Sequence, residues 1–172
     1  MDVHTPERRS HNMSRIRSRD TKPELLLRRA LHARGLRYRL HVRDLPGRPD
    51  LVFPGKRAVI FVNGCFWHGH DCPLFRVPAT RSEFWIEKIR ANVARDQSAG
   101  AALEELGWRQ LVVWECALRG RARMKLEDLA TRAAGFLRSQ HRTDEIAGAW
   151  SSATSLITPD PIRGDSVCAP RS

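Results

Sequence analysis

The chain has 172 residues, the length of one domain with its own core, and 41% of them are hydrophobic. It contains no run of about 18 apolar residues, and residues 1–4 lack the apolar segment of a signal peptide, so we expect a cytoplasmic protein without a membrane helix. A net charge of +11 favours a polyanionic partner, although charge alone leaves a generally basic surface as the alternative.

The positive charge is concentrated near the N-terminus. Residues 1–49 hold 13 Lys and Arg against 5 Asp and Glu. Within residues 1–20, Arg15, Arg17 and Arg19 alternate in a polar segment, which we interpret as a mobile basic arm. The alternative is a disordered tail whose charge is incidental.

Apolar periodicity and turn residues predict a mixed α/β domain over residues 21–139. Asp20 or Thr21 should cap its first helix, which ends at Gly35, and Ser82 should cap a long second helix. After Ser139 the chain is rich in Ser, Thr, Pro and Gly, so we expect a disordered tail over residues 140–172. The expected strands span 36–42, 50–53, 57–62 and 108–114, and the later helices span 83–106 and 124–137.

One loop after a buried strand combines soft metal ligands. Cys65, His70 and Cys72 can fold around a single ion, and Cys116 at the end of another strand can supply the fourth ligand. Three cysteines and a histidine form a closed structural zinc site with no position left for substrate. The alternative is buried cysteines without a metal. Cys168 lies in the expected tail and is not assigned to this site.

A second pattern has an acid at the start of a strand. Residues 45–49 form a turn, Asp50 begins the strand that follows, and a tight turn then joins this strand to its partner. Restriction-endonuclease-like nucleases have this layout, with Mg²⁺ held by the acid and by groups on the partner strand. The usual Glu-x-Lys of the partner strand is absent, since Phe61, Val62 and Asn63 occupy those positions. Taken alone, Asp50 could be a turn residue.

Five separated motifs follow one another in the chain: Gly47-Arg48-Pro49-Asp50, Gly64-Cys65-Phe66-Trp67-His68, Val77-Pro78-Ala79-Thr80-Arg81, Phe84-Trp85-x-x-Lys88 and Val113-Trp114-Glu115-Cys116-Ala117-Leu118. In this order, over about residues 8 to 137, they resemble the very-short-patch repair (Vsr) endonucleases. Matching five motifs is a specific signal. Members of that family nick DNA 5′ to the thymine of a T:G mismatch left by deamination of 5-methylcytosine.

The resemblance implies a catalytic centre. Asp50 would bind Mg²⁺ through its side chain, with help from the backbone carbonyl of Val62. His68 would act as general base for the attacking water or would stabilise the phosphorane. Glu24 would orient the metal-bound waters, although an acid in the first helical turn is equally natural as a partner of the helix dipole. Cys65, His70, Cys72 and Cys116 match the structural zinc set of the family.

The resemblance also implies DNA contacts. Phe66, Trp67 and Trp85 match the aromatic wedge that the family inserts between bases; the alternative is that they are core residues. The arginines of the N-terminal arm would grip the duplex. Asn63 departs from the family, which usually has histidine there. Asparagine can donate to a phosphate oxygen but cannot transfer a proton, so the rate and pH profile are affected.

We therefore expect an α/β, restriction-endonuclease-like (PD-(D/E)xK-type) mixed central sheet flanked by helices, with a structural zinc site. The expected activity is strand-specific, Mg²⁺-dependent mismatch nicking that initiates very short patch repair. The expected partner is double-stranded DNA with a T:G mismatch, bound by a monomer at the nucleoid, with mismatch-repair proteins as candidate partners. The alternatives are a restriction-type endonuclease of the same fold and a non-catalytic, zinc-stabilised mismatch-binding module. Asp50, His68 and Glu24 together argue against the module, because binding alone needs none of them.

Overall fold

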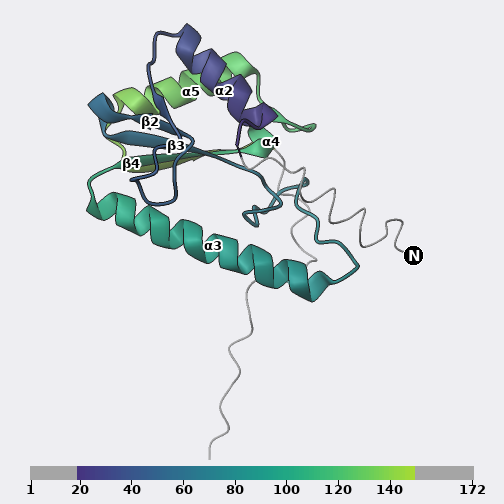
Figure 1. Ribbon diagram of the computed structural model, residues 1–172. Helices are drawn as coiled ribbons and strands as arrows, with labels where there is room; N and C mark the ends of the chain where they lie inside the picture. The colour runs from purple at the N-terminus through teal and green to yellow at the C-terminus, as the bar shows by residue number, and fades with distance from the viewer. Residues whose placement is uncertain (1–18, 150–172) are drawn as a thin grey trace, which may run out of the picture.

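A computed structural model describes residues 19–149, which form a mixed sheet flanked by helices (Figure 1). The five strands lie in the order β1-β2-β3-β4-β5. The first three are antiparallel neighbours, and β3, β4 and β5 are parallel to one another. Their bounds are Arg39–Leu40, Leu51–Phe53, Ala58–Asn63, Arg109–Trp114 and Thr143–Ile146.

Helices cover both faces of this sheet. Figure 1 shows α2 (Lys22–Ala33) and α5 (Leu126–Arg138) over one face and the long helix α3 (Ser82–Glu105) across the other. Two short helices, η1 (Pro54–Lys56) and α4 (Glu115–Leu118), connect β2 to β3 and follow β4. Within residues 19–149, no helix is long and apolar enough to cross a membrane.

The core follows the two-residue alternation of the strands. Along β2, Leu51 and Phe53 pack in the cluster beneath α2 and α5, whereas Val52 packs in a second cluster with Leu103 of α3. Each of these side chains is at most 2% exposed, and burying one contributes roughly 1.5–3 kcal/mol. Helices therefore pack against both faces of the sheet, and this packing fixes the positions of the strand ends.

The first helix begins where the sequence predicts. Thr21 is its N-cap, and its hydroxyl oxygen accepts a hydrogen bond from the backbone N–H of Glu24 at 3.4 Å. Gly35 follows the helix with φ +77°, the left-handed conformation that ends many helices. Leu27 and Leu31, one turn apart, are fully buried. This helix places Glu24 near Asp50, the residue that directly precedes β2.

Two expected boundaries are wrong. The strand predicted over 36–42 forms only at Arg39–Leu40, because His41 turns into the left-handed region with φ +47°. Ser82 does not cap α3; it is the first helical residue, and the cap position belongs to Arg81, whose side chain makes no capping bond. The sequence preferences for strands and helix caps act through residues close together in the chain. The two observed boundaries also depend on how neighbouring segments pack.

The expected tail also needs correction. Thr143–Ile146 forms strand β5, which pairs in parallel with β4, and Ile146 is fully buried. Polar composition concealed this strand, because its first three residues are exposed at the edge of the sheet. The rest of the predicted tail from 150 onward, and the arm residues Arg15 and Arg17, lie outside the described residues.

Candidate active site and metal centre

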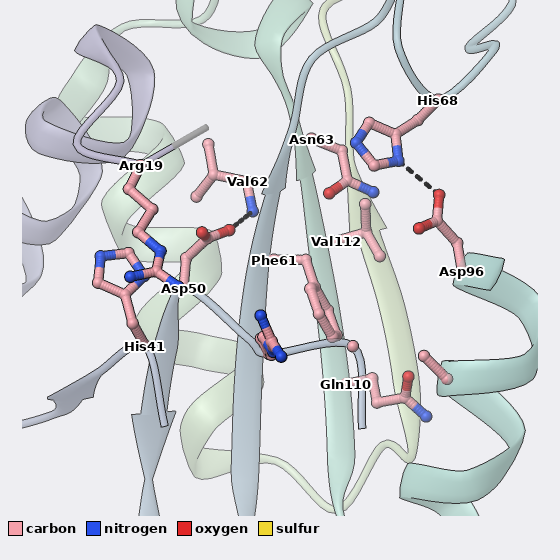
Figure 2. Close-up of a pocket in the computed structure, with 13 residues that line it drawn as sticks. Arg19, His41, Asp50, Phe61, Val62, Asn63, His68, Asp96, Gln110 and Val112 are labelled. Carbon is pink, nitrogen blue, oxygen red and sulfur yellow. Dashed lines mark hydrogen bonds and ion pairs between the residues drawn. The ribbon is translucent and has the colours of Figure 1, made fainter. Parts of the chain in front are cut away.

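A pocket of about 340 Å³ opens at the end of the sheet where β3 finishes (Figure 2). Strands β3 and β4, helix α3 and the loops before β2 and after β3 supply its walls. The structure brings five of the predicted site residues together in this pocket. These are Val62, Asn63, Asp50, His68 and Arg19.

The turn before β2 presents Asp50. Gly47 and Arg48 are both left-handed, with φ +71° and +52°. A Cβ on Gly47 would lie 2.9 Å from the Ala99 side chain, so glycine is required for this approach to α3. Asp50 Oδ2 accepts a hydrogen bond from the backbone N–H of Val62 at 2.7 Å. Since the N–H and C=O of one strand residue point to the same side, the Val62 carbonyl also faces the Asp50 side of β3.

Burial raises the pKa of Asp50 to about 6. The nearby Glu24 carboxylate raises it further, whereas the Val62 N–H, His41 and His68 lower it. A largely desolvated carboxylate with few compensating charges favours a bound cation, because the attraction grows as the local dielectric falls. Asp50 is thus suited to a hard divalent ion.

Glu24 lies behind the pocket rather than on its wall. It is 1% exposed, the one buried charged residue of the described chain. Its Oε1 accepts from Arg28 Nη1 at 3.2 Å and lies 3.4 Å from His41 Nε2, and His41 does line the pocket. This position is compatible with a role in orienting metal-bound waters. It is also compatible with a role as partner of the helix dipole, since Glu24 lies in the first turn of α2.

His68 pairs with an acid that the sequence analysis missed. Its Nδ1 lies 2.5 Å from Asp96 Oδ2 on α3, as Figure 2 shows. With Nδ1–H donating to Asp96, the neutral ring keeps Nε2 as an acceptor. The missed signal is helical spacing: Trp85, Asn92 and Asp96 recur at intervals of seven and four along α3, and Asn92 donates to the Trp67 carbonyl at 2.8 Å. One face of α3 therefore contacts the part of the loop that carries Phe66, Trp67 and His68.

The four predicted soft ligands meet at one point. Their donor atoms all lie within 4.8 Å of one another, and Cys116 Sγ is 3.7 Å from His70 Nδ1. A tetrahedral zinc ion separates a sulfur from a nitrogen ligand by about 3.6 Å. Burial raises the pKa of the Cys65 and Cys116 thiols and lowers that of His70, so a metal would have to compensate the thiolates. Cys65, His70, Cys72 and Cys116 could hold a metal ion.

The segment after α5 closes over this cluster. Gly148 N–H donates to Cys116 Sγ at 3.3 Å, and a Cβ at this glycine would lie 2.4 Å from the Cys116 carbonyl oxygen. Trp114 stacks on His70 with ring centroids 4.1 Å apart, and its Nε1 donates to Glu145 Oε2 at 3.2 Å. Residues beyond the predicted domain end thus orient two of the ligands.

The predicted wedge residues form one surface cluster. The ring centroids of Phe66 and Trp67 are 5.0 Å apart, and those of Trp85 lie 5.5 and 6.0 Å from them. All three are half-buried, and none belongs to a core cluster of the described chain. Phe84 beside them is 42% exposed. Their packing argues against the interpretation as core residues.

Comparison with known proteins identifies the family. A family model described as DNA mismatch endonuclease Vsr matches residues 1–74. The DNA mismatch endonuclease Vsr of Escherichia coli (strain K12) is 54% identical over 131 residues, which cover 76% of this chain and 84% of that protein. The chain belongs to the Vsr family. The Type II nicking enzyme V.XorIIP of Xanthomonas oryzae pv. oryzae is 54% identical over 114 residues, covering 66% and 84%. The Type II nicking enzyme V.NmeAIP of Neisseria meningitidis serogroup A is 41% identical over 121 residues, covering 70% and 86%.

Two further positions of this Vsr family member line the pocket. Asn63 is the last residue of β3 and stands between Val62 and the His68 loop (Figure 2). Arg19, the one arginine of the predicted arm triplet within the described residues, lies beside Asp50 and His41. The departure from histidine at position 63 therefore changes the wall of the pocket itself.

Proposed function

We propose that this protein is a Mg²⁺-dependent endonuclease that nicks DNA 5′ to the thymine of a T:G mismatch and so initiates very short patch repair. The observation that carries the proposal is the pocket that joins the half-buried Asp50 to the His68–Asp96 pair, next to a half-buried aromatic cluster. Membership of the Vsr family supports the same chemistry. The sheet, with the acid before β2 and a partner strand after a tight turn, supports a restriction-endonuclease-like fold of the PD-(D/E)xK type.

The roles in the pocket follow from its geometry. Asp50 and the Val62 carbonyl would hold Mg²⁺, which neutralises phosphate charge and activates water when bound. His68 accepts the proton of the attacking water at Nε2, because Nδ1 donates to Asp96. Asp96 holds the tautomer and stabilises the imidazolium that forms. Asn63 donates a hydrogen bond to a phosphate oxygen.

The second metal has a structural role. Three buried cysteines and one histidine make a closed set, and zinc is the ion that such a set selects. Zinc there fixes the loop between β3 and α3 to the end of β4, since Cys116 directly follows that strand. This loop carries both His68 and the aromatic pair of Phe66 and Trp67, so the zinc site positions catalysis and DNA contact together.

DNA binding rests on charge and aromatic side chains. The net charge of +11 favours a phosphate backbone, and the arm with Arg15, Arg17 and Arg19 grips the duplex. Phe66, Trp67 and Trp85 enter the base stack at the mismatch, where distortion costs less than at a matched pair. The protein acts as a monomer at the nucleoid in the cytoplasm, with mismatch-repair proteins as candidate partners.

The test is a nicking assay on end-labelled duplexes. A T:G duplex in several cytosine-methylation contexts and its matched counterpart are incubated with Mg²⁺ or with a chelator. We expect one Mg²⁺-dependent nick 5′ to the mismatched thymine and none on the matched duplex. Cutting of both strands, or equal cutting of matched DNA, would assign the restriction-type activity instead. Binding without cutting in any context would assign a zinc-stabilised binding module.

The His68–Asp96 pair makes a specific prediction. Asp96→Asn should slow single-turnover nicking by roughly 10- to 100-fold, because the neutral amide no longer stabilises the imidazolium. Mismatch affinity should stay within about twofold, since this change leaves the ring in place. The matched control is Glu87→Gln, an exposed acid of the same helix that does not line the pocket. Equal rates for the two variants would remove Asp96 from the mechanism.

The wedge makes another prediction. Trp67→Ala should reduce the preference for T:G over matched duplex by about tenfold, because base stacking on an aromatic ring is worth about 1–3 kcal/mol. Binding to matched duplex should change much less, since contacts to the phosphate backbone remain. Titration of both duplexes at one salt concentration measures the difference. An equal loss on both duplexes would contradict insertion at the mismatch.

A further inference from the structure

A histidine outside the family motifs quoted above occupies the Asp50 side of the pocket. The backbone N–H of His41 donates to the Asp50 carbonyl at 3.4 Å, which continues the β1–β2 ladder one residue beyond the Leu40–Leu51 pair. The left-handed backbone of His41 then ends the strand. Figure 2 shows its imidazole beside Asp50, with His68 on the far side of the pocket. The two are the imidazoles among the described pocket-lining residues.

The His41 ring carries an unmet donor. Nε2 is buried and makes no hydrogen bond within residues 19–149, although it lies 3.4 Å from Glu24 Oε1. Buried polar atoms are almost always hydrogen-bonded, so an unmet Nε2 that already faces a carboxylate oxygen at 3.4 Å indicates that the His41–Glu24 bond closes when the site is filled. The imidazolium and the Nε2–H tautomer both carry this donor, so its use does not depend on the charge of the ring.

The two oxygens of the Glu24 carboxylate have different surroundings. Arg28 Nη1 donates to Oε1, and His41 faces the same oxygen. No hydrogen bond from the described residues reaches Oε2. Both donors therefore face Oε1, and Oε2 is left to accept hydrogen bonds from water. Once His41 also donates to Oε1, two donors hold this oxygen from different sides, and the direction of Oε2 is fixed.

We infer that His41 is a positioning residue for nicking: its Nε2–H holds Oε1 of Glu24, so that Oε2 orients the water network at Asp50. This inference rests on the proposed function. It assigns a second imidazole to a pocket in which Asn63 stands where the family usually has histidine. His41 acts through Glu24 and does not replace His68 as the base.

Two variants separate the donor from the backbone. His41→Asn keeps a residue that tolerates the left-handed conformation but is too short to reach Glu24. His41→Gln places an amide N–H about where Nε2 lies. We expect His41→Asn to slow single-turnover nicking of a T:G duplex roughly 10- to 100-fold and His41→Gln to restore the rate to within about threefold. Mismatch affinity and zinc content should match the wild type, and the Mg²⁺ concentration for half-maximal rate should rise in His41→Asn.

A double-mutant cycle tests the route through Glu24. In a Glu24→Gln background, His41→Asn should slow nicking by less than about twofold, because the group it positions is already altered. Equal rates for His41→Asn and wild type would overturn the inference, as would additive losses in the cycle. If His41→Asn misfolds and loses mismatch binding, the test rests on His41→Gln. A His41→Gln variant that binds the mismatch normally but nicks more than about tenfold more slowly than the wild type would refute the donor role. Absence of nicking by the wild type would instead refute the proposed function, and this role with it.

Discussion

Asp50→Asn is expected to reduce the proposed Mg²⁺-dependent nicking by about a thousandfold or more, because it removes the charged side chain that we propose as ligand of the catalytic ion. Binding to a T:G duplex should stay within about twofold, since the amide oxygen can still accept from the Val62 N–H, now 2.7 Å from the carboxylate. Single-turnover rates at saturating enzyme measure the first effect, and duplex titration measures the second. Retained nicking would remove Asp50 from the catalytic centre.

The same substitution should stabilise the metal-free fold. Burial raises the pKa of Asp50 from its ordinary value of 3.8 to about 6 in the folded protein, so the folded state binds more protons between these pH values. The free energy of unfolding therefore falls as pH rises through this window, and the loss is complete above pH 6. Asp50→Asn should then be more stable than wild type at pH 7.5 by at most about 3 kcal/mol, and equal to it near pH 3.5.

Urea unfolding at the two pH values, without added Mg²⁺ and without chelator, checks this sign. Asp44→Asn is the matched control, because Asp44 is exposed and does not line the pocket. If Asp50→Asn were less stable than the wild type at pH 7.5, this would contradict a destabilising ionised carboxylate at position 50. Added Mg²⁺ should stabilise the wild type and leave Asp50→Asn unchanged, since binding to the folded state alone raises stability.

Cys72→Ser is expected to have the largest effect on folding. Serine is a poor zinc ligand, so the chain should lose the proposed structural zinc and about 3 kcal/mol or more of stability. The melting temperature should fall by roughly 6 °C or more, at about 2–4 °C per kcal/mol for a chain of this size. Elemental analysis and thermal unfolding measure both. Nicking should also be lost, because the same loop carries His68.

Cys168→Ser supplies the control with the same chemistry. Cys168 lies outside the described residues and is not part of the proposed ligand set, so its replacement should leave zinc content and melting temperature unchanged. Equal zinc content in Cys72→Ser and wild type would contradict the proposed ligand set. Loss of zinc without a change in melting temperature would contradict its structural role and leave only a binding site.

Much of the fold was predictable because its signals are local. The Thr21 cap, the apolar stripe with Leu27 and Leu31, and the alternation along β2 each depend on residues within one or two turns of chain. The same holds for three of the four metal ligands, which share one loop. Hydrophobic periodicity also placed β4 ahead of Cys116, so the fourth ligand could be assigned to a strand end.

The sequence by itself determined which residue types are available for chemistry: an acid before a strand, a loop with two thiols and two imidazoles, and aromatics outside the apolar pattern. Only the tertiary structure decided their partners. Asp96 meets His68 across 28 residues, β5 pairs with β4, and His41 faces Glu24 from another element. Periodicity shows which face of an element is buried, but packing between faces sets which side chains meet, and strand order and helix rotation are properties of the assembled core.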